Sequence, residues 1–205
     1  DWDNEAVFWL AEAGIRLHEL RWRDLLNPEW LTANRFPVIL YAAGESFVQT
    51  VKEQGDVERA LIRYLEQGGC LAAIPSMPFP FYYNEKGEVV RAAERLGFPI
   101  LGSGAPQSPE TPVAGWEHPP EGVKLVFHVD TGAFGGLLEK GDLYVSLAQM
   151  RDEKSNVYGD AVAYVEHRAS PPRNGRNLYV WMRMPDILGF SDTLYAVFSY
   201  LAQRL

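Results

Sequence analysis

A serine and its surroundings are the first residues of this 205-residue chain whose types and positions suggest chemistry. Ser76 follows the apolar run Leu71–Pro75, which we expect to be a buried strand. In an open α/β sheet, ligands and catalytic groups collect where the chain leaves the carboxyl end of a central strand. Ser76 is therefore a candidate nucleophile. A turn or capping serine is the alternative, because a nucleophile elbow needs small residues two positions to either side, where Ile74 and Pro78 stand.

Two histidines could serve as the base that such a serine needs. His128 lies two residues before Asp130 on an expected strand, so both side chains project to one face and suit a general base or metal ligation. The alternation predicts that this face meets solvent, with a buried face of Leu125, Phe127 and Val129. His167 follows Glu166, and adjacent strand residues point to opposite faces. We find no third metal ligand, so no metal site is expected.

Two segments that we expect to lie close to Ser76 in the fold have residue types that suit ligand binding. Gly44-Glu45-Ser46 follows another expected apolar strand, and its backbone N–H groups could hold an oxyanion or a ligand carboxylate. A simple glycine turn with a solvated Glu45 is the alternative. An aromatic loop offers flat faces that stack on sugar rings or anchor a partner protein, or that pack onto their own domain: Phe79, Phe81, Tyr82 and Tyr83, with Trp116.

The candidate residues lie in a segment of the chain where we expect strands and helices to alternate. The run 37–43 is apolar on both faces, as a central parallel strand is when helices cover both sides of a sheet. A helix capped by Asp56 and ended by Gly68-Gly69 follows, and then the strand at 71–75, which together predict a right-handed crossover unit. Further helices are expected from Asp3 or Asn4 to Ala13, at 89–97 and at 192–203. Further strands are expected at 15–20, 124–130, 160–167 and 177–184.

These elements predict one α/β domain over residues 1–205. We expect a three-layer, flavodoxin-like, mostly parallel sheet with helices on both faces. The late strands 160–167 and 177–184 are joined by a short turn, which suits an antiparallel pair. Because a doubly wound domain normally begins with a strand, we expect a first strand upstream and a longer parent polypeptide.

Composition narrows the classes of partner. The chain has 27 acidic and 19 basic side chains, a net charge of −8 and no basic cluster, so nucleic acid and anionic membranes are poor partners. No apolar run approaches the ~18 residues that span a bilayer, and no leader is recognisable, which leaves the compartment open. Cys70 is the single cysteine, so we expect it to be a buried thiol outside any internal disulfide. No cofactor is expected.

Three of these segments resemble the class I glutamine amidotransferase-like superfamily: Ala42–Glu45, Leu65–Gly69 and Leu71–Ser76. The late strands and the closing helix resemble its trehalose-utilisation-type branch and the amidotransferase-like middle domain of some β-galactosidases. The resemblance implies that Ser76 occupies the place of the nucleophilic cysteine, Gly44 the oxyanion loop, and His167 a place near the catalytic histidine. Because the elbow lacks a cysteine and the chain lacks a His-x-Glu dyad, glutamine hydrolysis through a thiolate is not expected.

The resemblance implies a non-catalytic accessory module of a larger carbohydrate-active protein, contributing ligand binding or subunit contact. Its partners would be other domains of the parent polypeptide, a carbohydrate or a second copy. The first alternative is a hydrolase with Ser76 as nucleophile, His167 or His128 as base, and the Gly44 amides as oxyanion hole. The second alternative is a sugar-binding module through the Phe79–Tyr83 loop. Whether the chain is an enzyme is left open, with a non-enzyme favoured.

Overall fold

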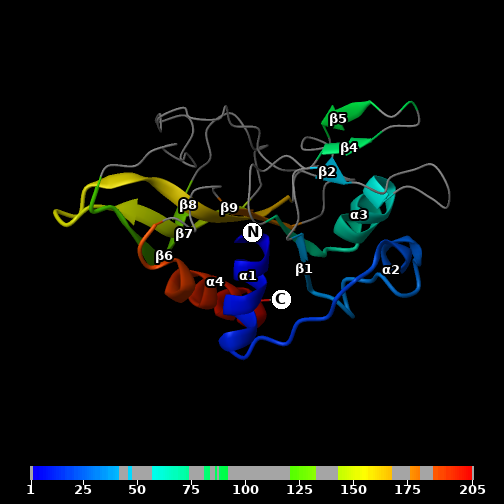
Figure 1. Cartoon of the computed structure of the whole chain (residues 1–205), viewed down its shortest axis with the longest axis horizontal. Helices are drawn as coiled ribbons and strands as arrows, with labels where there is room; N and C mark the ends of the chain where they lie inside the picture. Colours follow the sequence, from blue (N-terminus) through cyan, green and yellow to red (C-terminus); the bar gives the residue numbers. More distant parts are fainter. Residues whose placement is uncertain are drawn as a thin grey trace.

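A computed structural model describes residues 2–41, 46–47, 57–73, 81–83, 86, 88–91, 121–132, 143–167, 176–180 and 187–204 (Figure 1). The helices in this part of the chain are α1 (Trp2–Glu12), α2 (Trp22–Leu26), α3 (Val57–Glu66) and α4 (Phe190–Arg204). The strands are β1 (Val38–Tyr41), β2 (Ser46–Phe47), β3 (Cys70–Ala73), β4 (Phe81–Tyr83), β5 (Val89–Arg91), β6 (Lys124–Gly132), β7 (Leu143–Arg151), β8 (Val157–Glu166) and β9 (Arg176–Val180).

The described strands form a six-stranded mixed sheet and a separate three-stranded sheet. In the large sheet the order is β1-β3-β9-β8-β7-β6. Strands β1, β3 and β9 are parallel, whereas β8, β7 and β6 each run antiparallel to the preceding neighbour in that order. The small sheet has the order β2-β4-β5. The predicted flavodoxin-like, mostly parallel sheet is therefore wrong, although the predicted antiparallel pairing of β8 with β9 is confirmed.

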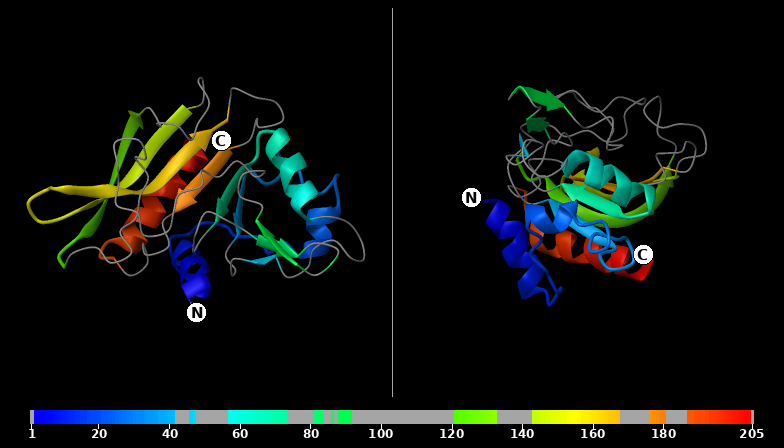
Figure 2. Two further views of the ribbon diagram at one scale, coloured as in Figure 1. Left: turned by 90° about the horizontal axis from the view of Figure 1, so that it is seen from above. Right: turned by 90° about the vertical axis from the view of Figure 1, so that its right-hand side faces the viewer.

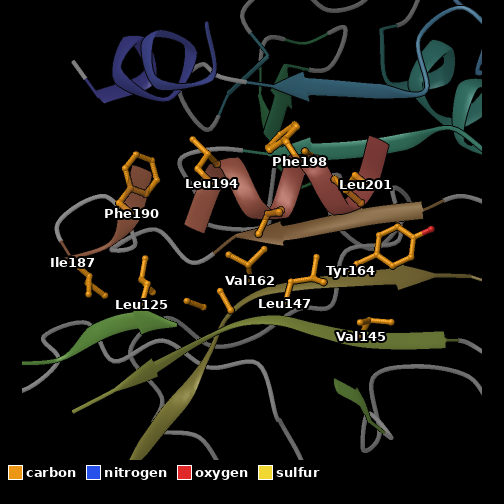
Figure 3. Close-up of a cluster of buried hydrophobic side chains, with 14 of the residues drawn as sticks. Leu125, Val145, Leu147, Val162, Tyr164, Ile187, Phe190, Leu194, Phe198 and Leu201 are labelled. Atoms are coloured by element: carbon orange, nitrogen blue, oxygen red, sulfur yellow. The ribbon is translucent and has the colours of Figure 1, made fainter. Parts of the chain in front are cut away.

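The layers around the large sheet differ between its two halves (Figure 2). On β3, Cys70 and Ala72 belong to the core that α1 and α4 share, while Leu71 belongs to the core under α3, so helices lie on both faces of this strand. On the antiparallel half, α4 packs against one face, where its buried side chains meet those of β7 and β8 (Figure 3). The predicted three-layer fold is therefore wrong, because among the described residues helices lie on both faces of β3 but α4 covers one face of the antiparallel half.

The secondary structure differs from the prediction in three segments, and these differences explain why the predicted fold was wrong. Strand β7 was not expected at all, because its burial on both faces gives no alternation to recognise. Residues 15–20 were expected to form a strand but have no regular secondary structure. Val89–Arg91 was expected to begin a helix but forms β5, antiparallel to β4, in keeping with the strand preference of consecutive valines.

A buried tyrosine joins α3 to the starts of β1 and β3. The Tyr64 hydroxyl lies 2.8 Å from the carbonyl oxygen of Phe36, to which it donates, and accepts the N–H of Cys70 at 3.1 Å. The ring passes so close to Gly69 that an added Cβ there would lie 2.2 Å from it. Glycine is thus the residue that allows α3 to approach the sheet at this point.

Replacing Tyr64 by phenylalanine is expected to lower the free energy of unfolding by about 0.5–1.5 kcal/mol, because the carbonyl of Phe36 loses a hydrogen bond, whereas the N–H of Cys70 keeps the carbonyl of Pro37 as a partner. Urea unfolding of wild type and variant measures this difference. The control is Tyr195→Phe on the exposed side of α4, which should change stability by less than about 0.5 kcal/mol. Equal stabilities for the two variants would contradict this role of Tyr64.

Candidate functional site

The parallel strands β1 and β3 end at the same edge of the large sheet. Their pairing runs from Val38 opposite Cys70 to Tyr41 opposite Ala73, so the two carboxyl ends are level. In α/β sheets this edge is where ligands bind. The candidate residues Ser76, Gly44, Glu45, Phe79 and Trp116 lie outside the described residues.

Two segments expected to be ligand-binding loops are adjacent strands instead. Ser46 pairs with Phe81 and Phe47 with Tyr82 in the parallel pair β2 and β4. On the other side of β4, Tyr83 pairs with Val89 of β5. The prediction of a loop at residues 81–83 is therefore wrong. The backbone nevertheless places Ser46 beside the aromatic residues of β4, as Figure 1 shows for the small sheet. We call β2, β4 and β5 the small sheet below.

His167 follows β8 at the opposite edge of the large sheet. Glu166 pairs with Arg176, and Arg176 pairs with Cys70, the first residue of β3. His167 is buried and lies beyond this pair, at the edge where β3 begins. Ser76 follows β3 at the other end of the strand. Because Ser76 itself lies outside the described residues, the pairing of Ser76 with His167 stays a prediction.

The predicted catalytic residue His128 lies on β6, and its side chain contacts Ser146 of β7. It was expected to face solvent, but Phe127 is 37% exposed and Val129 is 52% exposed, whereas His128 is half-buried. The register of β6 and β7 shifts between Phe127 and Asp130, which marks a β-bulge. The prediction holds for Leu125, which is buried, and for Asp130, which is exposed, but it is wrong for residues 127–129, where the bulge inserts an extra residue.

The imidazole of His128 ends a chain of buried polar groups, which we call the polar cluster: His128, Tyr144, Ser146 and Asp160. His128 Nε2 lies 2.7 Å from Ser146 Oγ, and Ser146 Oγ donates to Asp160 Oδ1 at 2.7 Å. The Tyr144 hydroxyl donates to Asp160 Oδ2. Ser146 and Asp160 are each 4% exposed. Three strands, β6, β7 and β8, contribute to this cluster.

Ser146 and Asp160 were not among the residues predicted to belong to a site. The available signal was a polar residue inside each of two apolar runs, at residues 143–148 and 159–165. Such residues are usually hydrogen-bonded when buried, so a pair of them predicts mutual contact. Their separation of 14 positions in the sequence concealed that contact.

The order of groups in the polar cluster differs from that of a catalytic triad. In a triad the imidazole lies between serine and carboxylate, whereas here Ser146 lies between His128 and Asp160. The single hydroxyl proton of Ser146 is donated to Asp160, so His128 Nε2 must carry a proton to donate to Ser146 Oγ. The imidazole therefore cannot take the proton of Ser146 in this state. The arrangement gives the buried carboxylate of Asp160 its hydrogen-bond donors and does not activate Ser146 as a nucleophile.

Burial and nearby charges also shift the pKa of His128. Partial burial lowers the pKa of His128 below the ordinary imidazole value. The positive charge of Arg151 lowers this pKa further, while the negative charges of Asp160 and Asp130 oppose the shift. The neutral imidazole is therefore favoured at neutral pH.

Cys70 is fully buried at the start of β3, as expected. Within the described ranges, no group of three or more His, Cys, Asp or Glu side chains could hold a metal ion. None of the described helices combines the length and the apolar character needed to cross a bilayer. Comparison of the chain with protein-family models, with curated proteins and with solved structures gives no match.

Proposed function

We propose that this chain is a non-catalytic accessory module of a larger carbohydrate-active protein and that it binds a saccharide at the small sheet. The observation that carries the proposal is the pairing of β2 with β4, because it holds Ser46 and Phe47 beside Phe81 and Tyr82. Neighbouring backbone positions that carry aromatic and hydroxyl-bearing residue types suit a sugar, which offers apolar C–H faces and many hydroxyls.

The location of the small sheet supports the same proposal. The chain leaves β1 at Tyr41 and enters β2 at Ser46, and it leaves β3 at Ala73 and enters β4 at Phe81. Both connections start from the level carboxyl ends of neighbouring parallel strands. This is the edge that α/β proteins use for ligands, so the aromatic residues of β4 follow directly from it.

Two features argue that the module is not a hydrolase. His167 lies at the edge where β3 begins, away from the end that leads to Ser76. His128 already contacts Ser146, whose proton is committed to Asp160. These two placements support a non-catalytic module, while Ser76 itself lies outside the described residues.

Replacing Tyr82 by alanine is expected to weaken saccharide binding by about tenfold or more, because the variant loses an aromatic stacking surface. Isothermal titration calorimetry against a panel of neutral oligosaccharides measures the affinity. The matched control is Tyr195→Ala, which removes an exposed tyrosine from α4 and should bind as wild type does. A panel that gives no heat with wild-type protein, or equal affinity for both variants, would contradict a saccharide site on the small sheet.

Subunit contact is the second candidate function, and α1 favours it. Leu10 is fully buried against α4, but its neighbours Phe8 and Trp9 are 54% and 41% exposed. The two rings contact each other edge to face, with centroids 5.4 Å apart. Large apolar side chains gathered on one exposed helix are typical of surfaces that another protein covers. We propose a second copy of the chain as that protein.

Replacing Phe8 by serine is therefore expected to reduce self-association, because the buried apolar area between copies shrinks. Sedimentation velocity over a concentration series measures the association. The control is Val157→Ser, which removes an exposed apolar side chain from the start of β8 and should leave association unchanged. A wild-type protein that stays monomeric at all concentrations would exclude the second copy.

A further inference from the structure

Strand β6, at one edge of the large sheet, pairs with β7 in two segments. Lys124 to Phe127 pair with Arg151 to Ala148 of β7, and Asp130 to Gly132 pair with Ser146 to Tyr144. Between these segments the register shifts, so residues 128 and 129 form a bulge with no paired Cα partner on β7. His128 Nε2 lies at this bulge, 2.7 Å from Ser146 Oγ of β7. A side-chain contact between β6 and β7 therefore accompanies the register shift.

The charge of the imidazole changes the cost of burying the ring rather than its ability to donate, because the imidazolium also carries a proton on Nε2. Neutral His128 with a proton on Nε2 donates to Ser146 Oγ, and Ser146 donates to Asp160, so each group has a partner. A second proton would have to enter at Nδ1 and would place a cation in a half-buried position. Moving the imidazole into water removes the desolvation cost of that cation.

The charged groups that face His128 act in both directions. Asp160 from β8 and Asp130 from β6 attract an imidazolium, while Arg151 from β7 repels it. Tyr144 and Ser146 already donate to the two oxygens of Asp160, which weakens its pull on a further cation. Among the described residues, burial is therefore the dominant influence, and it disfavours the charged ring.

We propose that the His128–Ser146 contact is a pH-sensitive latch, which holds residues 130–132 of β6 against β7 when the imidazole is neutral and releases them when it is protonated. In the open state the ring lies in water and has the ordinary imidazole pKa, whereas in the closed state its pKa is lower. The open state thus binds more protons between these two values. The latch is fully closed above the ordinary imidazole pKa and opens as the pH falls toward the lowered one.

Hydrogen exchange of the full chain at about pH 7.5 and about pH 5 tests the latch, with protection factors corrected for intrinsic exchange. In wild type, the protection of residues 130–132 and of their partners 144–146 should fall by about threefold or more on acidification. In His128→Gln, whose amide can donate to Ser146 at every pH, protection should stay constant. The control His18→Gln removes an imidazole that stacks on Phe36 with centroids 5.6 Å apart, and it should behave as wild type does.

Two outcomes would overturn the latch. One is equal loss of protection in wild type and His128→Gln. The other needs no variant: the His128 ring resonances, followed by NMR through a pH titration, should give a midpoint below the ordinary value of about 6.5. A midpoint at or above that value would mean that Asp160 holds the imidazolium in place, so that acid would tighten the contact instead of releasing it.

Discussion

The arrangement of the site rests on the hydroxyl of Tyr64. This one buried group of α3 contacts the chain entering β1, through the carbonyl of Phe36, and the first residue of β3, through the N–H of Cys70. Gly69 leaves room for the ring, since a Cβ at that position would overlap it. The two strands are thereby held in register at their starts and end level at Tyr41 and Ala73. Their level ends are the reason that the following segments can meet in the small sheet.

Strand β9 is the place where the large sheet changes direction. It runs parallel to β3 on one side and antiparallel to β8 on the other. Because of this reversal, the carboxyl end of β8 lies where β3 begins, and His167 is carried to that edge. The antiparallel half also provides the polar cluster, in which buried Asp160 accepts hydrogen bonds from two hydroxyl groups. The two halves therefore differ: the parallel half ends at the edge where we propose binding, and the antiparallel half holds a buried polar contact.

The sequence predicted best where one physical pattern dominated a segment. The apolar stripe of α3 and the flanking runs predicted the β1-α3-β3 unit, and the short turn predicted the antiparallel pair β8 and β9. Prediction failed where distant contacts decide. Strand β7 is buried on both faces and shows no alternation. His128, expected to face solvent, is half-buried at the bulge after Phe127, and only the folded sheet brings Ser146 to Asp160. The aromatic segment 81–83 looked like a loop because one strand partner, β2, lies far back in the sequence and the other, β5, was expected to begin a helix.

The central claim is that β2 and β4 are neighbours in one defined register, with Ser46 opposite Phe81. The double variant Ser46→Cys/Phe81→Cys tests it, because paired strand residues have a Cα separation that a disulfide can span. Mild oxidation followed by intact-mass spectrometry should show rapid formation of an internal disulfide. The matched variant Ser46→Cys/Tyr83→Cys, shifted by two residues along β4, should oxidise much more slowly. Equal oxidation of the two variants, or none in either, would contradict the pairing on which the proposed binding site depends.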